Sequence, residues 1–525
     1  MGAEGVGHGL ECYEQGVARR HGRNLPTVSR PASGRDDPAT GVDGRPGGVL
    51  AGAVATLIRN GVVLPMTGDR AVVDPGSVLV DGTAIVAVGP VAALDADPRA
   101  AGAEVVDATG HAVLPGLHNC HMHSGLLRGT AESLSLWDWL RTYVDPAHRA
   151  ITPEIARVAA RHCYAESLLA GTTSVMDMWR HLEGAAAEAG RLGVRATLVP
   201  YVADEEGYDY FESIASNRAL LEAVGTGAAG GRVRAWVGLE HLFYCTEACV
   251  ADAVALAAEF GTGLHTHSSE TPWEVEEAQR RWGRRPVEVL ADRGVLGPAT
   301  VIAHCVWLDD AEIALLAATG TAVAHCPCSN MKLASGPARV ADLRAAGVVV
   351  GLGSDGEKVN NTLDLLEEMK FASLLQKVTL LDPTAGDPWD VLAMATVDGA
   401  RALGLADVTG SLAPGKRADV VTVDLGGLHT TPVLRGEHQN VPAHLVFSSS
   451  GHDVRDVWVD GERLVAGGRP LTFDVAAVRA EAQAAAEDLF ARMSARRPTA
   501  AGVTRSRGGP ATAARTSPTP AGGSR

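Results

Sequence analysis

The sequence lacks three features that would direct it to a nucleic acid, a membrane or the outside of the cell. Its net charge is −16, and no Lys/Arg-rich run is long enough to follow a phosphate backbone. No apolar run reaches the ~20 residues that a membrane span needs. The first 30 residues contain no hydrophobic segment behind a basic start. We therefore expect a cytoplasmic protein whose partner is a small molecule.

Cysteine is also scarce, with eight residues in a chain of 525. Their spacing does not form the dense framework of a disulfide-stapled secreted domain. Cys326 and Cys328 form a C-x-C without a second cysteine pair, which argues against a structural zinc site. We interpret the cysteines as reduced thiols.

Composition divides the chain into a central region, two β-rich flanks and two terminal segments. Residues 1–52 and 498–525 are rich in Gly, Arg, Pro and Ser without apolar periodicity, so we expect both to be disordered. Residues 53–111 and 406–472 alternate short β-branched runs with Gly, Asp and Pro turns. We predict that these two flanks form one small composite β domain.

The central region, 112–405, alternates strand-like apolar runs with Ala/Leu/Glu-rich helical stretches. This alternation predicts a parallel α/β core, and the number of units favours an eight-stranded TIM-like (β/α)8 barrel over a short open sheet. Residues 473–497 read as a C-terminal helix that packs on the barrel. The strand-like runs are TTSVMDM, RATLVPYV, RAWVGLE, TGLHTH, TVIAHC, TAVAHC and VVVGLGSD.

Histidine and aspartate residues stand where these predicted strands end. His121 and His123 are two residues apart, which points both imidazoles to the same side of a strand. His267, His304 and Asp355 each end another apolar run. Because chemistry in such barrels lies at the carboxyl ends of the strands, we predict that these side chains meet there.

Imidazoles and a carboxylate together suit a divalent metal such as Zn²⁺. We predict His121, His123, His267 and Asp355 as its ligands. Glu270 follows His267 by three residues, where a turn can place its carboxylate for acid–base work; the alternative is a glutamate that stabilises a helix N-terminus. No lysine occurs between His123 and His267, so that stretch offers no carboxylated lysine to bridge two metals. One metal is the better prediction.

Several motifs then occur in a recognisable order: PGLHNCHMH, LLRGTAESLSLWDWL, HTHSSET, IAHCVWL, HCPCSNMKLASG and GSDGEKVNN. Over roughly residues 55–470 the chain resembles the amidohydrolase superfamily, in the branch of S-adenosylhomocysteine/methylthioadenosine deaminases and triazine chlorohydrolases. The resemblance implies a (β/α)8 barrel with a flanking β-sandwich, a single Zn²⁺ (Fe²⁺ in some relatives) and a homo-oligomer.

The resemblance also implies roles for individual residues. Asp355 would be both ligand and the base that takes a proton from the attacking water, and His304 would orient that water. Glu270 would protonate the ring nitrogen beside the attacked carbon and pass a proton to departing ammonia. Trp139 matches an aromatic residue that covers the heterocycle, unless it packs in the core. His241 matches a histidine that reaches the ribose in nucleoside deaminases.

Two positions depart from the nucleoside-deaminating pattern. Where such relatives carry a P-x-E whose glutamate binds ribose hydroxyls, this chain has Pro146, Ala147 and His148. A neutral imidazole cannot accept two hydroxyl hydrogen bonds as a carboxylate can, so His148 either binds the substrate differently or lies at the surface. Trp307 stands where many relatives have His.

We therefore predict a hydrolase that acts on carbon–nitrogen bonds and removes ammonia from an aminated purine or purine-like ring. An adenosine-type nucleoside with a modified 5′ position is the expected substrate class. Two alternatives stay open. One is a triazine-type chlorohydrolase or aminohydrolase, and the other is a catalytically silent barrel that serves binding or assembly.

Overall fold

The computed structural model describes residues 54–495, apart from residues 131, 135, 209 and 226–230. The segments 1–52 and 498–525, for which we expect disorder, lie outside the described residues. None of the helices within the described part of the chain combines the length and apolar character of a membrane crossing.

Nine parallel strands form the centre of the structure in two sheets. Every hydrogen-bonded pair in them is parallel, and helices separate the strands along the chain except between β9 and β10, where only Trp236 intervenes. The expected parallel α/β core is confirmed. In sheet order, one sheet contains β10 (Val237–His241), β11 (Leu264–Ser268), β12 (Thr300–His304), β13 (Ala322–His325) and β14 (Val350–Leu352), and the other contains β6 (Leu117–Met122), β7 (Thr172–Trp179), β8 (Arg195–Pro200) and β9 (Val233–Ala235).

The two parallel sheets are neighbours at both ends. β14 lies against β6, and β10 lies against β8. Just beyond β14, the Asp355 backbone N–H donates to the carbonyl of His121 at 3.0 Å. The ends of β6 and β14 are therefore fixed next to each other, although they are far apart in the sequence.

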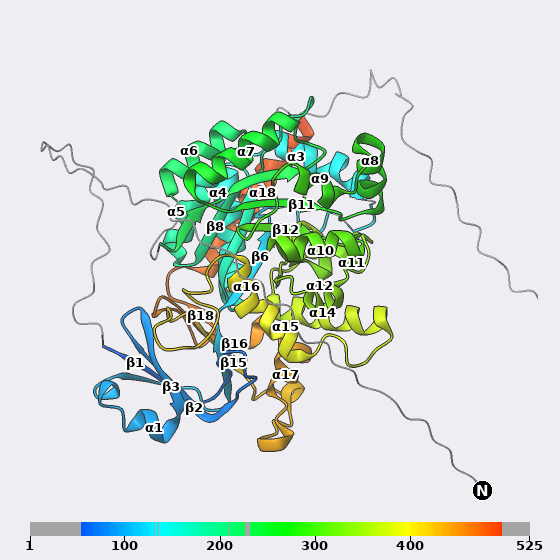
Figure 1. Cartoon of the computed structure of the whole chain (residues 1–525). Helices are drawn as coiled ribbons and strands as arrows, with labels where there is room; N and C mark the ends of the chain where they lie inside the picture. The colour runs from blue at the N-terminus through cyan, green and yellow to red at the C-terminus, as the bar shows by residue number, and fades with distance from the viewer. Residues whose placement is uncertain (1–53, 131, 135, 209, 226–230, 496–525) are drawn as a thin grey trace, which may run out of the picture. The chain divides into compact units, whose positions relative to one another are not determined.

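Helices cover these strands (Figure 1), and α7 shows how one of them is capped. In α7, the Thr246 hydroxyl accepts from the Cys249 N–H at 3.2 Å, and Gly261 ends the helix with a φ of 59°. The helices that follow β6 to β14 are α2 (Leu136–Trp139), η2 (Leu140–Val144), α3 (Asp145–Ala150), α4 (Pro153–Leu169), α5 (Leu182–Leu192), α6 (Ile214–Val224), α7 (Glu247–Phe260), α8 (Pro272–Trp282), α9 (Pro286–Asp292), α10 (Asp310–Thr319), α11 (Pro327–Lys332), α12 (Val340–Ala345), α13 (Glu357–Asn360), α14 (Leu365–Leu380), α15 (Pro388–Ala395) and α16 (Val397–Ala402).

Strands from both flanks join one nine-stranded sheet, whose first strands are blue in Figure 1. Its centre is β5, which pairs in parallel with β1 and antiparallel with β15. β5 begins at His111, so residues 111–115 belong to this sheet. The strands are β1 (Thr56–Val63), β2 (Val73–Asp81), β3 (Ala84–Pro90), β4 (Glu104–Asp107), β5 (His111–Pro115), β15 (Val420–Asp424), β16 (Val454–Val459), β17 (Glu462–Ala466) and β18 (Arg469–Pro470).

Short helices accompany this sheet, and a longer helix closes the described chain. The short ones are α1 (Val91–Asp95), η1 (Pro98–Ala100), η3 (Leu428–Thr430), η4 (Gly436–His438), α17 (Val441–Phe447) and η5 (Gly451–Asp453). The longer one, α18 (Val475–Ala495), packs on α3 and α4, where Leu489 and Met493 are buried.

A buried ion-pair cluster connects the nine-stranded sheet to the parallel strands. Arg195 of β8 donates to both oxygens of Asp419, at 2.6 and 3.0 Å, and also to Asp460. All three side chains are buried. Charges held in low dielectric depend strongly on their partners, so this cluster should be sensitive to the loss of one member.

We expect Arg195→Met to lower the free energy of unfolding by about 3–5 kcal/mol, because it leaves the Asp419 carboxylate buried without its partner. Urea denaturation of both proteins measures this change. The matched control is Arg492→Met, which removes a half-exposed pair with Asp488 and should change stability by less than about 1 kcal/mol. Equal effects of the two substitutions would contradict the assignment.

Candidate metal centre

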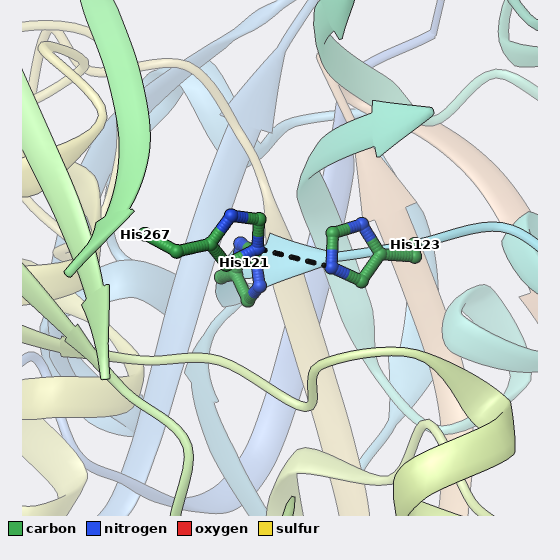
Figure 2. A group of neighbouring side chains, drawn as sticks. All are labelled: His121, His123 and His267. Atoms are coloured by element: carbon green, nitrogen blue, oxygen red, sulfur yellow. Dashed lines mark hydrogen bonds between the residues drawn. The ribbon is translucent and has the colours of Figure 1, made fainter. Parts of the chain in front are cut away.

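Five polar side chains from four strand ends converge on one point. His121 and His123 come from the end of β6, His267 from β11, His304 from β12 and Asp355 from just beyond β14. The His123 and His267 Nε2 atoms are 3.2 Å apart. Figure 2 shows these two rings pointing toward each other. The Asp355 Oδ1 lies 3.4 Å from the His123 Nε2 and 3.6 Å from the His121 Nε2.

The far side of each histidine ring is held by a fixed acceptor. The His123 Nδ1 donates to the Met178 carbonyl at 2.6 Å, and the His267 Nδ1 donates to the Glu240 carbonyl at 2.5 Å. Since a carbonyl can only accept, both Nε2 atoms present a lone pair to the centre. Burial lowers the pKa of His123 and of His267 well below the usual value, which keeps both rings neutral.

His121 is oriented by a second histidine. The His265 Nδ1 donates to the Val301 carbonyl at 2.9 Å, so the His265 Nε2 accepts from the His121 Nδ1 at 2.8 Å. The His121 Nε2 therefore faces the centre, where it is buried and has no hydrogen-bond partner among the described residues. An unsatisfied imidazole nitrogen among other donors fits a metal ligand.

Asp355 is held by neighbouring donors. Its Oδ2 accepts from the Ser329 hydroxyl and its Oδ1 from the Gly356 N–H, both at 2.6 Å. Burial raises the pKa of Asp355, but the surrounding histidines, His121 first, outweigh it and leave that pKa well below its usual value. Asp355 and His304 both have positive φ, 58° and 70°, a strained conformation typical of functional sites.

The donor set suits a divalent metal. One ligand atom each of His121, His123 and His267 lie within 4.8 Å of one another, and so do those of His121, His304 and Asp355. Neutral imidazoles with a carboxylate are the ligands of catalytic zinc. The chain can thus hold a metal at this point.

A buried acid–base pair lies beside these ligands. The Glu270 Oε2 is 3.7 Å from the His304 Nε2, and its Oε1 accepts from the Ser335 hydroxyl at 3.2 Å. The His304 Nδ1 lies 3.0 Å from the Asn330 Oδ1. Burial raises the pKa of Glu270, despite the opposing charge of His304. Burial lowers the pKa of His304, but the charges of Glu270 and Asp355 raise it more.

A cavity of about 650 Å³ opens over this centre. Trp139 is buried in its wall and donates from Nε1 to the Thr130 hydroxyl at 3.4 Å. His241 also lines it and lies 3.0 Å from Glu274. The lining residues are His123, Trp139, Leu140, Val144, Tyr201, Glu240, His241, Phe243, Tyr244, His267, Glu270, Glu274, His304, Leu333, Asp355, Lys358 and Val359.

His148 and Trp307 do not line this cavity. His148 is only 2% exposed, and its ring stacks on Tyr201 at 5.2 Å between centroids, so it is not a surface residue. Trp307 is 42% exposed, and its Nε1 donates to the Ser335 carbonyl at 2.6 Å.

Sequence reasoning did not find several residues of the site. His265 forms an H-x-H with His267, and this period-two spacing could have placed both on one face of β11. Tyr201 and Glu240 line the cavity but carry no motif of their own, and Lys358 also lines it although only Asp355 was singled out in the motif GSDGEKVNN.

Comparisons with known proteins agree with this geometry. The Amidohydrolase family matches residues 112–464, and the chain belongs to this family. It is 38% identical over 440 residues to a 5′-deoxyadenosine deaminase of Methanosarcina mazei, covering 83% of this chain and 99% of the relative. It is also 38% identical over 411 residues to a 5-methylthioadenosine/S-adenosylhomocysteine deaminase of Symbiobacterium thermophilum, covering 77% of this chain and 92% of the relative.

Solved structures give the same assignment. A zinc-bound adenosine deaminase of Xanthomonas campestris superimposes with a TM-score of 0.78 at 32% identity, covering 83% of this chain and 99% of that one. The zinc complex of the atrazine chlorohydrolase TrzN of Arthrobacter aurescens gives 0.75 at 25% identity, covering 82% and 100%. The expectation of an amidohydrolase that acts on carbon–nitrogen bonds is confirmed.

We expect His265→Asn to weaken zinc binding by about 10- to 100-fold, because His121 loses the acceptor that orients it. Competition with a chromophoric chelator measures the affinity. The matched control is His118→Asn. His118 is a buried histidine on β6, the strand of His121, and it has no hydrogen-bond partner among the described residues. If both variants bind zinc as the unchanged protein does, the orienting role of His265 is refuted.

Glu240 provides a prediction about pH. Burial raises the pKa of Glu240 from 4.5 to about 8, although His241 opposes it. Between these values the folded protein binds more protons than the unfolded chain, so this group makes stability fall as pH rises. Glu240→Gln removes that dependence.

The stability of Glu240→Gln relative to the unchanged protein should therefore increase by about 1 kcal/mol per pH unit across this window and then level off. Urea denaturation at several pH values measures it. The exposed Glu276→Gln should show no such trend. A pH-independent difference for Glu240→Gln would mean that Glu240 is ionised in the folded protein.

Proposed function

We propose that this protein is a hydrolytic deaminase of an adenosine-type nucleoside, in the class of 5′-deoxyadenosine, methylthioadenosine and S-adenosylhomocysteine. The observation that carries the proposal is the position of Glu270. This buried carboxyl has a raised pKa and lies 3.7 Å from His304, inside the cavity that Asp355 also lines. A protonated carboxyl there suits a ring nitrogen that must gain a proton before ammonia leaves.

The metal that we propose is a single Zn²⁺, with Fe²⁺ as the alternative, held by His121, His123, His267 and Asp355. A divalent ion held by these donors supplies the Lewis acidity that lets water lose a proton near neutral pH.

The side chains divide the remaining chemistry. Asp355 takes the proton of the attacking water, because two fixed donors hold its carboxylate in place. His304 orients that water, with its own ring fixed by Asn330. Glu270 gives its proton to the ring nitrogen, takes the second proton of the added water and passes it to the amino group, which leaves as ammonia while the ring keeps an oxo group. The proton held by Asp355 then returns Glu270 to its protonated form.

The cavity wall supports a heterocyclic substrate. Trp139 offers an indole to cover the ring, and His241, next to Glu274, can reach a sugar hydroxyl. Since His148 lies behind Tyr201, we propose that His148 affects the substrate by positioning that tyrosine.

Triazine hydrolysis is the second candidate, because the same donors serve both reactions and the triazine hydrolases share the fold. The deaminating relatives are more similar in sequence, at 38% against 25% identity. This difference favours the nucleoside. A silent binding barrel has little support, since the ligands and Glu270 are all in place.

We further propose that the two parallel sheets close into a (β/α)8 barrel within residues 112–405, from β6 onward, with a flanking β-sandwich built from residues 53–111 and 406–472, to which β5 adds residues 112–115. A homo-oligomer in the cytoplasm accords with the family resemblance. All seven cysteines in the described part of the chain are free thiols, as a reducing compartment would allow.

Ammonia release from a panel of 5′-deoxyadenosine, methylthioadenosine, S-adenosylhomocysteine and adenosine tests the function. We expect Glu270→Gln and Asp355→Asn each to lower kcat by about 10²–10⁴-fold, because each removes a proton-transfer group. Glu276→Gln, six residues from Glu270 and exposed, should retain full activity. No ammonia from any nucleoside, with chloride released from a chlorotriazine, would favour the second candidate instead.

A further inference from the structure

Lys358 is a buried cation that the proposed deamination does not use. It belongs to α13, three residues after Asp355, and its side chain is only 4% exposed. It lines the same cavity as His123 and Asp355. Among the described lining residues, Lys358 is the only lysine or arginine.

Its ammonium group has no acceptor in contact with it. The Lys358 Nζ has no hydrogen-bond partner among the described residues. The neighbouring Glu357 is directed elsewhere, since its Oε1 accepts from the Leu127 N–H at 2.6 Å. The face of Trp179 contacts the ammonium, with its centroid 4.6 Å from the Nζ, and the carboxylates of Glu357 and Asp177 interact with the charge without accepting a hydrogen bond from it. Cation–π contact offsets only part of the desolvation of a buried ammonium.

The chain makes room for this side chain. A Cβ atom at Gly356 would lie 2.5 Å from the Lys358 Nζ. The φ of Gly356 is −71°, which any residue can adopt. The end of the lysine therefore occupies the space beside Gly356, and a larger residue there would displace the Nζ.

We propose that Lys358 is a specificity residue that binds a negatively charged or carbonyl oxygen of the substrate. That the bound molecule is a substrate rests on the proposed function, whereas the binding of an anion by Lys358 does not. Across the same cavity, the ionised carboxylate of Glu274, next to His241, repels such an oxygen. An acceptor oxygen is thus directed to the Lys358 side. It belongs either to an acidic substituent of the nucleoside or to an oxo group on its ring.

A pair of simple probes tests the anion site without any turnover. Benzoate and benzamide have nearly the same shape but differ in charge, and calorimetry on the zinc-loaded protein measures the affinity of each. We expect Lys358→Met to lower benzoate affinity at least 10-fold and to leave benzamide affinity unchanged. Lys370→Met, which removes an exposed lysine of α14, should change neither.

Thermal unfolding adds a readout that a structural role would move in the opposite direction. If Lys358 is kept for a ligand, Lys358→Met removes a buried ammonium that has no hydrogen-bond acceptor, and Tm rises. Benzoate affinity within twofold of the unchanged protein would overturn the proposal, since benzoate held by the metal alone survives the substitution. A lower Tm for Lys358→Met would also overturn it, because the ammonium would then stabilise the fold.

Kinetics distinguish the two sources of the oxygen. For the substituent, the kcat/KM of adenosine-5′-carboxylate is divided by that of 5′-deoxyadenosine, which lacks the acidic group. For the ring, the kcat/KM of isoguanosine, which carries an oxo group, is divided by that of adenosine. Lys358→Met should lower the kcat/KM ratio of one pair at least 10-fold. Unchanged ratios in both pairs would refute the role of Lys358 while deamination stands. If no nucleoside is deaminated, the proposed function fails and the benzoate comparison still decides the anion site.

Discussion

The metal centre depends on hydrogen bonds that leave it rather than on contacts within it. His123 and His267 each give their Nδ1 proton to a backbone carbonyl, of Met178 on β7 and of Glu240 on β10. His121 uses His265, which is held by the Val301 carbonyl on β12. These carbonyls are positioned by the register of the parallel strands, so the pairing of the sheet selects the tautomer of every ligand. Any change that slips one strand would turn an imidazole away from the metal.

One cavity keeps three buried carboxyls in different states. Burial holds Glu240 protonated, with a pKa of about 8. Burial also raises the pKa of Glu274, but His241 opposes it and leaves that pKa below its usual value. Glu270 stands between these cases, since burial raises its pKa while His304 opposes the change. Neighbouring residues of the same chemical type can therefore act as hydrogen-bond donor, counter-ion and proton carrier.

The sequence predicted those residues of the site that are identified by their spacing from near neighbours in the chain. The H-x-H of His121 and His123 and the polar ends of apolar runs sufficed, because strand periodicity translates directly into direction. His148 shows the limit. Its motif predicts a place near the substrate, but α3 turns its ring onto Tyr201, which the sequence places far away. Glu240 and Lys358 were missed for the same reason, since their environments are built by strands that meet only in the folded chain.

The nine-stranded sheet imposes an order on the making of this protein. β5 has β1 on one side and β15 on the other. During synthesis, β1 is available at once, whereas β15 emerges only when residues 420–424 have left the ribosome. Until then the second edge of β5 is unpaired and can pair with other chains. The last strands thus complete a surface that the first strands leave vulnerable, and a nascent chain that stalls in the core would expose it longest.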